Sequence, residues 1–248
     1  MQDFLTRLDC QSLKAISFDL DDTLHAYRNA ASAAMDAVYV YIAEEYGRSP
    51  ESLHSAYADI LANAQSLHFT EDKPAREYRR ARFDALLQHF SIVGLHDTEN
   101  CLDIYQDALD ANMTPLPGAK EALVAANDAG LTTLVVTEGP TDAQQHALEL
   151  LGMAPLVTHL KTSSQTGLCK EGGLYQHVAS ELKIPGSQIL HVGDNPERDG
   201  RAAKKAGWHA LIVGKDDNRY GLPHIAELSE LTEWLNKNPA PAAMRRGI

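Results

Sequence analysis

The stretch that decides the fold is "KAISFDLDDT", residues 14 to 23, in which an apolar-leaning run leads directly into a group of acidic residues. The first part of this stretch has the length and character of a buried β-strand. Asp19 and Asp21 stand at its end, followed by Asp22 and Thr23. Because like charges so close together repel each other, the pattern indicates a strand that brings carboxylates to a site.

Composition limits the possible functions. The chain of 248 residues has 44% hydrophobic and 23% charged residues, which is ordinary for a globular protein. Its formal net charge of -12 argues against nucleic acid as a partner. No apolar run approaches the roughly 20 residues needed to cross a bilayer. The beginning of the chain lacks the pattern of a secretion signal, and its three cysteines lack metal-ligand spacing. We therefore expect a cytoplasmic protein with no membrane or nucleic-acid partner, either a monomer or a homodimer.

A long segment after the first strand has the composition of helices and few strand signals. Four helices are predicted there in succession, which indicates an all-helical unit. They cover residues 29–47, 49–67, 74–90 and 98–113.

Beyond residue 114 the pattern changes, because apolar strands now alternate with amphipathic helices. Strands are predicted at 131–136, 156–161, 188–192 and 208–213, and helices at 119–129, 141–151, 174–182, 197–206 and 225–234. This alternation predicts the α/β class, with a doubly wound parallel sheet. Residues 1–25 and 115–248 would form a catalytic core, and residues 26–114 an inserted helical cap.

Polar residues stand where the predicted strands end, and ligands of open parallel sheets bind beyond those ends. Asp19 follows the first strand, Thr137 the second and Asp194 a later one, while Lys170 precedes a helix. Clustered carboxylates suit a hard cation such as Mg²⁺, and a hydroxyl and an ammonium can hold phosphate oxygens. A carboxylate beside the metal could attack phosphorus, and a second could transfer a proton.

Four short motifs carry a family resemblance. The motifs "DLDDT" at 19–23, "VVT" ending at Thr137, Lys170 and "GDNPERD" at 193–199 resemble, in this order, the four motifs of the haloacid dehalogenase superfamily. The resemblance covers the α/β body, from residue 14 to about residue 213, and the helical insertion falls where that family places its cap. It implies a Rossmann-like core that carries out the catalysis.

The resemblance also implies roles for individual residues. Asp19 would be the nucleophile and Asp21 the general acid/base. Thr137 and Lys170 would bind the transferring phosphoryl group, together with the backbone N–H groups of Leu20 and Asp21.

A metal site is part of the same resemblance. Asp194 would ligate Mg²⁺ together with the Asp19 carboxylate and the Asp21 backbone carbonyl, and Asp199 would support them as an outer partner. The implied function is a Mg²⁺-dependent phosphatase that forms an aspartyl-phosphate. Its substrate would be a small phosphorylated metabolite, such as a sugar phosphate, a phosphorylated acid or a nucleoside monophosphate. A phosphomutase, or a non-enzymatic binding or regulatory protein with the same fold, is the alternative. Because Asp21 is present, phosphate chemistry is favoured over carbon–halogen cleavage.

Three residues near these motifs have less certain roles. Glu138 stands where relatives often have Asn. It either faces the cap and helps select the substrate or points to solvent, and the sequence favours solvent. His25 is expected to be a hinge-side residue without a chemical role. Asp22 is expected to shape the turn rather than to bind metal.

Several arginines gather in the third predicted cap helix. Arg79 or Arg80 could reach a second anionic group on the substrate. Alternatively, the arginines could pair with Glu77 and Asp84 on a solvated face of the helix.

Overall fold

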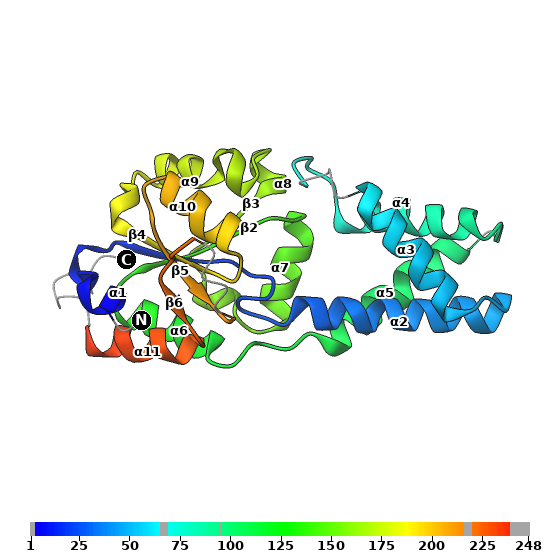
Figure 1. Cartoon of the computed structure of the whole chain (residues 1–248), viewed down its shortest axis with the longest axis horizontal. Coiled ribbons are helices and arrows are strands. Elements are labelled where there is room, and N and C mark those ends of the chain that lie inside the picture. Colours follow the sequence, from blue (N-terminus) through cyan, green and yellow to red (C-terminus); the bar gives the residue numbers. More distant parts are fainter. Residues whose placement is uncertain (1–2, 65–68, 95, 216–219, 239–248) are drawn as a thin grey trace.

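The computed structural model describes residues 3–64, 69–94, 96–215 and 220–238. Six parallel strands form one sheet in the order β3-β2-β1-β4-β5-β6 (Figure 1). The strands are β1 (Ala15–Phe18), β2 (Thr132–Thr137), β3 (His159–Thr162), β4 (Ile189–Gly193), β5 (His209–Val213) and β6 (His224–Ile225). The predicted α/β class is confirmed. Because β1 lies inside the sheet, the residues that follow it reach the middle of the carboxyl edge.

The register brings three strand ends together. Phe18 is the last residue of β1, and it pairs with Val135 of β2 and Val192 of β4. The backbone N–H of Asp19 then donates to the Val192 carbonyl oxygen at 2.9 Å. The acidic stretch therefore begins at the sheet edge, directly between the ends of β2 and β4.

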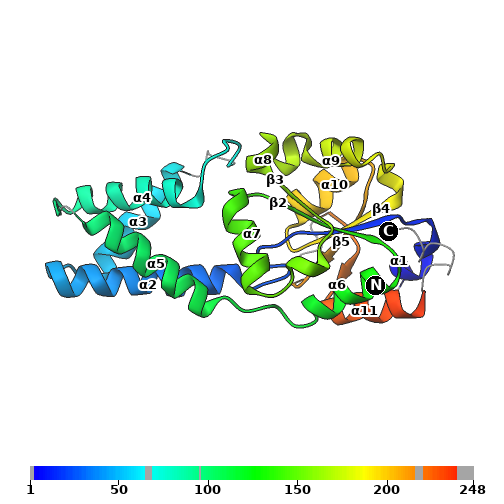
Figure 2. The ribbon, with the colours of Figure 1, turned by 180° about the vertical axis from the view of Figure 1, so that it is seen from behind.

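Helices cover both faces of the sheet (Figures 1 and 2). They are α1 (Asp3–Arg7), α6 (Ala119–Asp128), α7 (Thr141–Leu150), α8 (Ser163–Thr166), α9 (Tyr175–Leu182), α10 (Ala202–Lys205) and α11 (Leu228–Lys237). Ile16 and Phe18 of β1 belong to the apolar cluster under α6, α7 and α11, whereas Ala15 belongs to the cluster under α9 and α10. This alternation is the two-residue period of a strand buried on both faces.

The inserted segment folds as four helices with their own apolar core. They are α2 (Tyr27–Tyr46), α3 (Pro50–Ala64), α4 (Ala75–His89) and α5 (Asp97–Asn112). Leu53, Phe83 and Leu86 are fully buried in a cluster made only of residues from this segment. The predicted helical residues 65–67 lie outside the described part of the chain. We propose that the division into a core and a cap, as drawn from the sequence, describes this arrangement.

One expectation about local structure was wrong. Residue 225 was expected to begin the last helix, but His224 and Ile225 pair with Ile212 and Val213 to form β6. The helix begins only at Leu228. The helix expected at 197–206 is present: a π-helical first part, Pro196–Arg201, continues directly into α10, and the Asn195 side chain accepts the first N–H groups of this helix.

The cap contacts the core through the segment before α4 as well as through its covalent links. The Asp142 carboxylate of α7 accepts the Ala75 N–H at 3.0 and 3.1 Å. The hydroxyl of Ser163 donates to the Phe69 carbonyl oxygen at 3.2 Å. These bonds fasten the cap beside the carboxyl edge of the sheet.

Candidate active site

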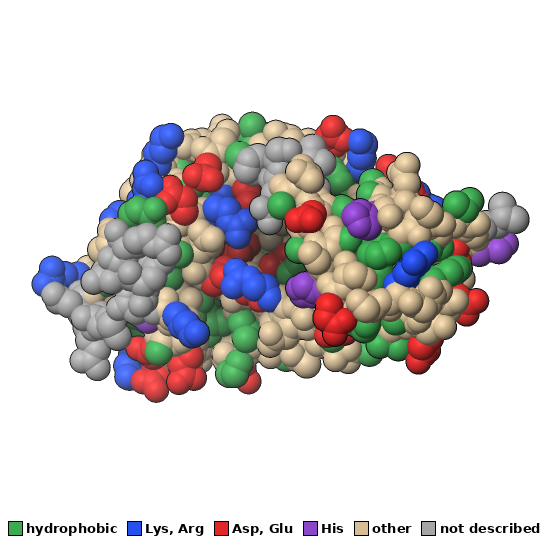
Figure 3. Space-filling model, turned by 45° about the vertical axis from the view of Figure 1, so that its right-hand side comes forward, with side chains coloured by type: hydrophobic (Ala, Val, Ile, Leu, Met, Phe, Trp, Pro, Cys, Tyr) green, Lys and Arg blue, Asp and Glu red, His purple; other side chains and the backbone are tan. Residues whose placement is uncertain are grey.

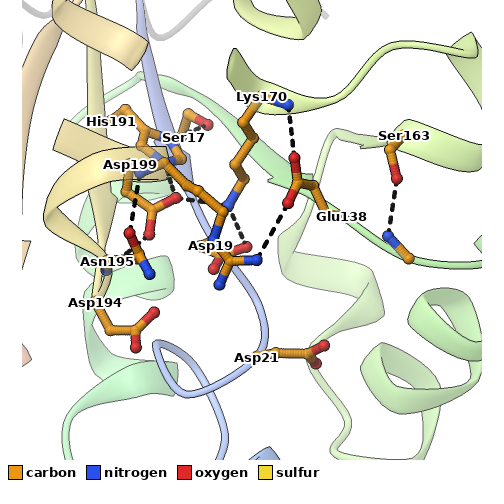
Figure 4. Close-up of polar contacts among 12 residues, drawn as sticks. Ser17, Asp19, Asp21, Glu138, Ser163, Lys170, His191, Asp194, Asn195 and Asp199 are labelled. Carbon is orange, nitrogen blue, oxygen red and sulfur yellow. Dashed lines mark hydrogen bonds and ion pairs between the residues drawn. The ribbon is translucent and has the colours of Figure 1, made fainter. Parts of the chain in front are cut away.

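A buried lysine lies between two carboxylates at the end of β1 (Figure 4). Lys170 Nζ lies 2.7 Å from Asp19 Oδ1 and 2.6 Å from Asp199 Oδ1, and all three residues are buried. The structure thus brings together three predicted site residues from distant parts of the chain. Their side chains come from the end of β1, from the π-helical turn Lys170–Leu174 and from the turn after β4.

One lysine can balance only one of these carboxylates, and the pKa values reflect this. Burial raises the pKa of Asp19 to about 7, although the Lys170 ammonium opposes this effect. Burial disfavours the charge of Lys170, but Asp19 and Asp199 outweigh it and raise its pKa. Burial also tends to raise the pKa of Asp199, but the Lys170 charge and the hydrogen bond with His191 outweigh this effect and lower the pKa. Asp19 therefore carries the charge that is left uncompensated.

The acids at this edge suit a divalent cation. Asp19, Asp194 and Asp199 can place one carboxylate oxygen each within 4.8 Å of one another. Both Asp199 oxygens already accept protein donors, Lys170 Nζ and the Asn195 N–H among them. Asp194 is free of such backbone bonds in the described residues, and burial and the charge of Asp199 raise its pKa. Hard oxygen ligands with uncompensated charge are what Mg²⁺ prefers.

A second cation approaches the acids from the cap. Arg28, on the first turn of α2, places NH2 3.2 Å from Asp194 Oδ2 and Nε 3.0 Å from Asp22 Oδ2. Asp22 also accepts the Arg28 N–H at 3.0 Å and has a left-handed φ of 60°. Asp22 is therefore a turn and helix-start residue, as its position in the sequence indicated.

The predicted proton-transfer residue lies apart from the lysine cluster (Figure 4). His25 Nε2 lies 3.0 Å from Asp21 Oδ1, and Gln144 Nε2 donates to Asp21 Oδ2 at 3.4 Å. His25 is fully buried. His25 lies on the hinge side, as expected, where it pairs with Pro115, and its contact with Asp21 is an addition that the sequence did not indicate.

The predicted phosphate-binding groups lie at the same edge. Thr137 ends β2 and is buried. The N–H groups of Leu20 and Asp21 donate to no protein acceptor in the described part of the chain, although Leu20 is fully buried. Such free buried donors are rare and suit an anionic ligand.

Glu138 does not point to solvent, so the expectation favoured by the sequence was wrong. Its Oε1 accepts the Lys170 N–H at 2.7 Å, and its Oε2 lies 3.2 Å from Arg198 NH1. The carboxylate therefore fixes the backbone of the buried lysine. Glu138 also lines the cleft described below.

A cleft of about 780 Å³ extends from this edge into the cap. Asp21 and Glu138 line it, whereas Asp19 and Lys170 are not among its lining residues. In the space-filling view, acidic and basic side chains gather around a recess near the middle of the face (Figure 3). Arg79 lines the cleft, but Arg80 does not. Arg80 instead pairs with Glu99, so only Arg79 keeps the substrate contact proposed for one of the two.

Sequence reasoning missed a polar group buried behind the lysine cluster. His191 lies 2.9 Å from Ser17 Oγ through Nδ1, and its Nε2 lies 2.9 Å from Tyr175 OH and 3.2 Å from Asp199 Oδ1. Tyr175 OH donates to the Arg198 carbonyl oxygen at 3.0 Å. A neutral imidazole protonated on Nε2 satisfies all these contacts, and burial lowers the pKa of His191 in agreement. Polar residues at inward positions of two predicted strands were the available signal.

The comparisons with known proteins agree with this geometry. A family model described as haloacid dehalogenase-like hydrolase matches residues 13–207. A haloacid dehalogenase-like hydrolase domain-containing protein 3 from Xenopus laevis is 26% identical over 82% of this chain and 84% of its own length. A ribulose-1,5-bisphosphate 5-phosphatase from Halopiger xanaduensis is 27% identical over 80% and 83%. A HAD-hydrolase of Bacillus subtilis, solved with magnesium bound, superposes with a TM-score of 0.69 at 20% identity, covering 90% of this chain and 99% of that one.

Fold and site define an α/β enzyme of the hydrolase class, with its acids at the carboxyl edge of the sheet and a helical insertion above them. The chain belongs to the haloacid dehalogenase-like hydrolase family, as the four motifs predicted. No helix in the described residues is long and apolar enough to cross a membrane. The cytoplasmic setting and the monomeric or homodimeric state stay predictions.

Proposed function

We propose that this protein is a Mg²⁺-dependent phosphatase that hydrolyses a small phosphomonoester through an aspartyl-phosphate on Asp19. The observation that carries the proposal is the buried arrangement in which Lys170 lies between Asp19 and Asp199. It supplies a carboxylate for attack and a fixed cation beside it. Two matched relatives named as phosphatases, the ribulose-1,5-bisphosphate 5-phosphatase above and a glyceraldehyde 3-phosphate phosphatase from Methanopyrus kandleri, support the class.

In the proposed reaction, an Asp19 oxygen attacks phosphorus and the bond to the ester oxygen breaks. Asp21, held by His25, gives its proton to the departing oxygen. Water then attacks the aspartyl-phosphate, Asp21 takes the proton back, and inorganic phosphate leaves with the Asp19 carboxylate restored. Each step balances without an added co-reactant.

Charge neutralisation is what phosphoryl transfer chiefly needs. Lys170 and the free N–H groups of Leu20 and Asp21 offer positive groups to the phosphoryl oxygens. Asp194 and Asp19 would hold Mg²⁺, with the Asp21 carbonyl as a further ligand. Bound there, the ion neutralises charge on the transferring group and orients it.

The test is phosphate release from a panel of phosphorylated metabolites, with Mg²⁺ and with EDTA, on wild type and Asp19→Asn. We expect release by the wild type in Mg²⁺ alone. Activity that survives EDTA or the Asn substitution contradicts the mechanism. Conversion between phosphorylated isomers with little phosphate release would identify a phosphomutase instead.

A further inference from the structure

Arg79 and Arg82 line the cap end of the cleft and differ from their neighbours on α4. Arg76 lies 2.8 Å from both Glu99 and Asp103, and Arg80 also pairs with Glu99. These two cations are neutralised by acidic residues of α5, although Arg76 also lines the cleft. In the described residues, Arg79 and Arg82 have no carboxylate partner.

The contacts of Arg79 and Arg82 are with aromatic rings and a neutral amide. Arg79 lies 4.8 Å from the centre of the Tyr105 ring and donates to Gln106 Oε1 at 2.5 Å. Arg82 lies 5.8 Å from the centre of the Phe69 ring. Both are half-buried, and their three-residue spacing places them on one side of the helix. Their charges therefore remain available to a ligand in the cleft.

None of the described carboxylates that line the cleft is paired with Arg79 or Arg82. Among the lining carboxylates, Asp21 is bonded to His25, Glu138 to Arg198 and Asp142 to a backbone N–H. Asp36, an exposed residue of α2, is the one carboxylate that lines the cleft from the described part of the cap.

A continuous wall joins the catalytic edge to Arg79. The His25 ring, bonded to Asp21, lies 6.0 Å from the Tyr27 ring in an edge contact. Tyr27 and Tyr105 also line the cleft, and the Arg79 guanidinium lies over the Tyr105 ring. A ligand whose ester lies near Asp21 can therefore extend along this wall toward the arginine.

The cap contributes aromatic as well as aliphatic side chains to the walls of the cleft. Six aromatic side chains of the cap line the cleft. They are Tyr27, Tyr39, Tyr57, Phe69, Tyr78 and Tyr105. A volume of about 780 Å³ with such walls suits a ligand of drug-like size, because pockets for such ligands run from roughly 300 to 1,000 Å³.

We propose that Arg79 and Arg82 form a subsite for a second anionic group, and that the substrate is a phosphomonoester whose alcohol part has an extended apolar body bearing a carboxylate or a second phosphate. This inference rests on the proposed function for the placement of the ester. It assigns the cap end of the cleft to the far end of the same molecule. A forked guanidinium stacked on an aromatic ring is well suited to bind either anion.

The experiment measures binding, so that its outcome is separate from catalysis. Alkylphosphonates from propyl to octyl, which cannot be hydrolysed as esters, are titrated calorimetrically in Mg²⁺ beside their ω-carboxy counterparts. In wild type the carboxylate should tighten binding by about 10-fold at the chain length that spans the cleft. In Arg79→Met and in Arg82→Met the gain should fall below about 2-fold, the range of an exposed ion pair.

Arg80→Met is the matched control, since it removes the same charge from the same helix but faces Glu99. It should keep the gain, and Arg79→Lys should keep part of it, because lysine retains the charge without the fork. Circular dichroism verifies that each variant is folded. If Arg79→Met fails to fold, Arg82→Met carries the test alone.

Three results overturn the subsite: no gain from the carboxylate at any chain length, no binding of any phosphonate, or an equal loss in Arg80→Met. The proposed function fails by a different result, the absence of phosphate release in Mg²⁺. If the ω-carboxy phosphonates bind more tightly to a protein that releases no phosphate, the subsite is supported and the proposed function is not.

Discussion

Replacing Asp19 by Asn should stabilise the metal-free protein at alkaline pH. Asp19 is buried, and Lys170, shared with Asp199, does not fully compensate its charge. Asn has nearly the same volume and no charge to desolvate. The variant that abolishes the proposed nucleophile should therefore be the more stable protein when Mg²⁺ is removed.

The magnitude follows from the pKa of Asp19, which burial raises from 3.8 to about 7. Between these values the folded protein holds a proton that the unfolded chain has released, so this contribution to stability is lost as the pH rises. Each pKa unit corresponds to ~1.4 kcal/mol, which makes the full effect ~4 kcal/mol. Between about pH 5 and about pH 8, the free energy of unfolding of the wild type should fall by ~2.5 kcal/mol relative to that of Asp19→Asn.

Urea unfolding in EDTA at a series of pH values measures this difference. Asp107→Asn is the control, since it removes one exposed carboxylate from the cap. Adding Mg²⁺ should stabilise the wild type more than Asp19→Asn, because a ligand that binds only the folded state stabilises it. A gap between wild type and Asp19→Asn that stays constant with pH, or that narrows toward pH 8, would refute the reasoning.

Three further changes test the surroundings of the site. Gly193→Ala places a Cβ 2.3 Å from Asp199 Cγ, so thermal unfolding should show a loss of about 2–3 kcal/mol; an unchanged melting temperature would contradict this packing. Glu138→Asn should lower kcat about 10- to 100-fold for all esters alike, because Glu138 positions Lys170 rather than the substrate; a changed substrate ranking would restore its selective role. Asp142→Ala removes the acceptor at the start of α4, so hydrogen exchange of residues 69–75 should speed up while the sheet stays protected; equal rates would show that the contact does not fasten the cap.

The α/β core could be predicted because its pattern is local. The run before Asp19 and the later apolar strands carry their own hydrophobic signal, and parallel strands must end at one edge. That rule placed Asp19, Thr137 and Asp194 together, whereas Lys170 was placed by its position before a helix. The short β6 could not be foreseen, because a strand of two residues has no period of its own and exists only through its pairing with β5.

The cap charges show a second limit. Arg79 and Arg80 are adjacent in sequence and are the same residue type, so the sequence does not show which of them faces the cleft. The helix directs one toward the cleft, whereas Arg80 meets Glu99, a residue of α5. Only the packing of α4 against α5 decides which charge stays available.

Glu138 shows why side-chain direction is the part of an active site that sequence leaves undetermined. Its neighbour Thr137 places it at the carboxyl edge, and the sequence favoured a side chain that points to solvent. The structure satisfies that charge with the Lys170 N–H and with Arg198, which are 32 and 60 positions away. An acid at this edge is therefore compatible with phosphate binding when a backbone donor and a guanidinium face it. The unfavourable free energy of burying the Glu138 carboxylate is offset by groups that lie near it only in the folded chain.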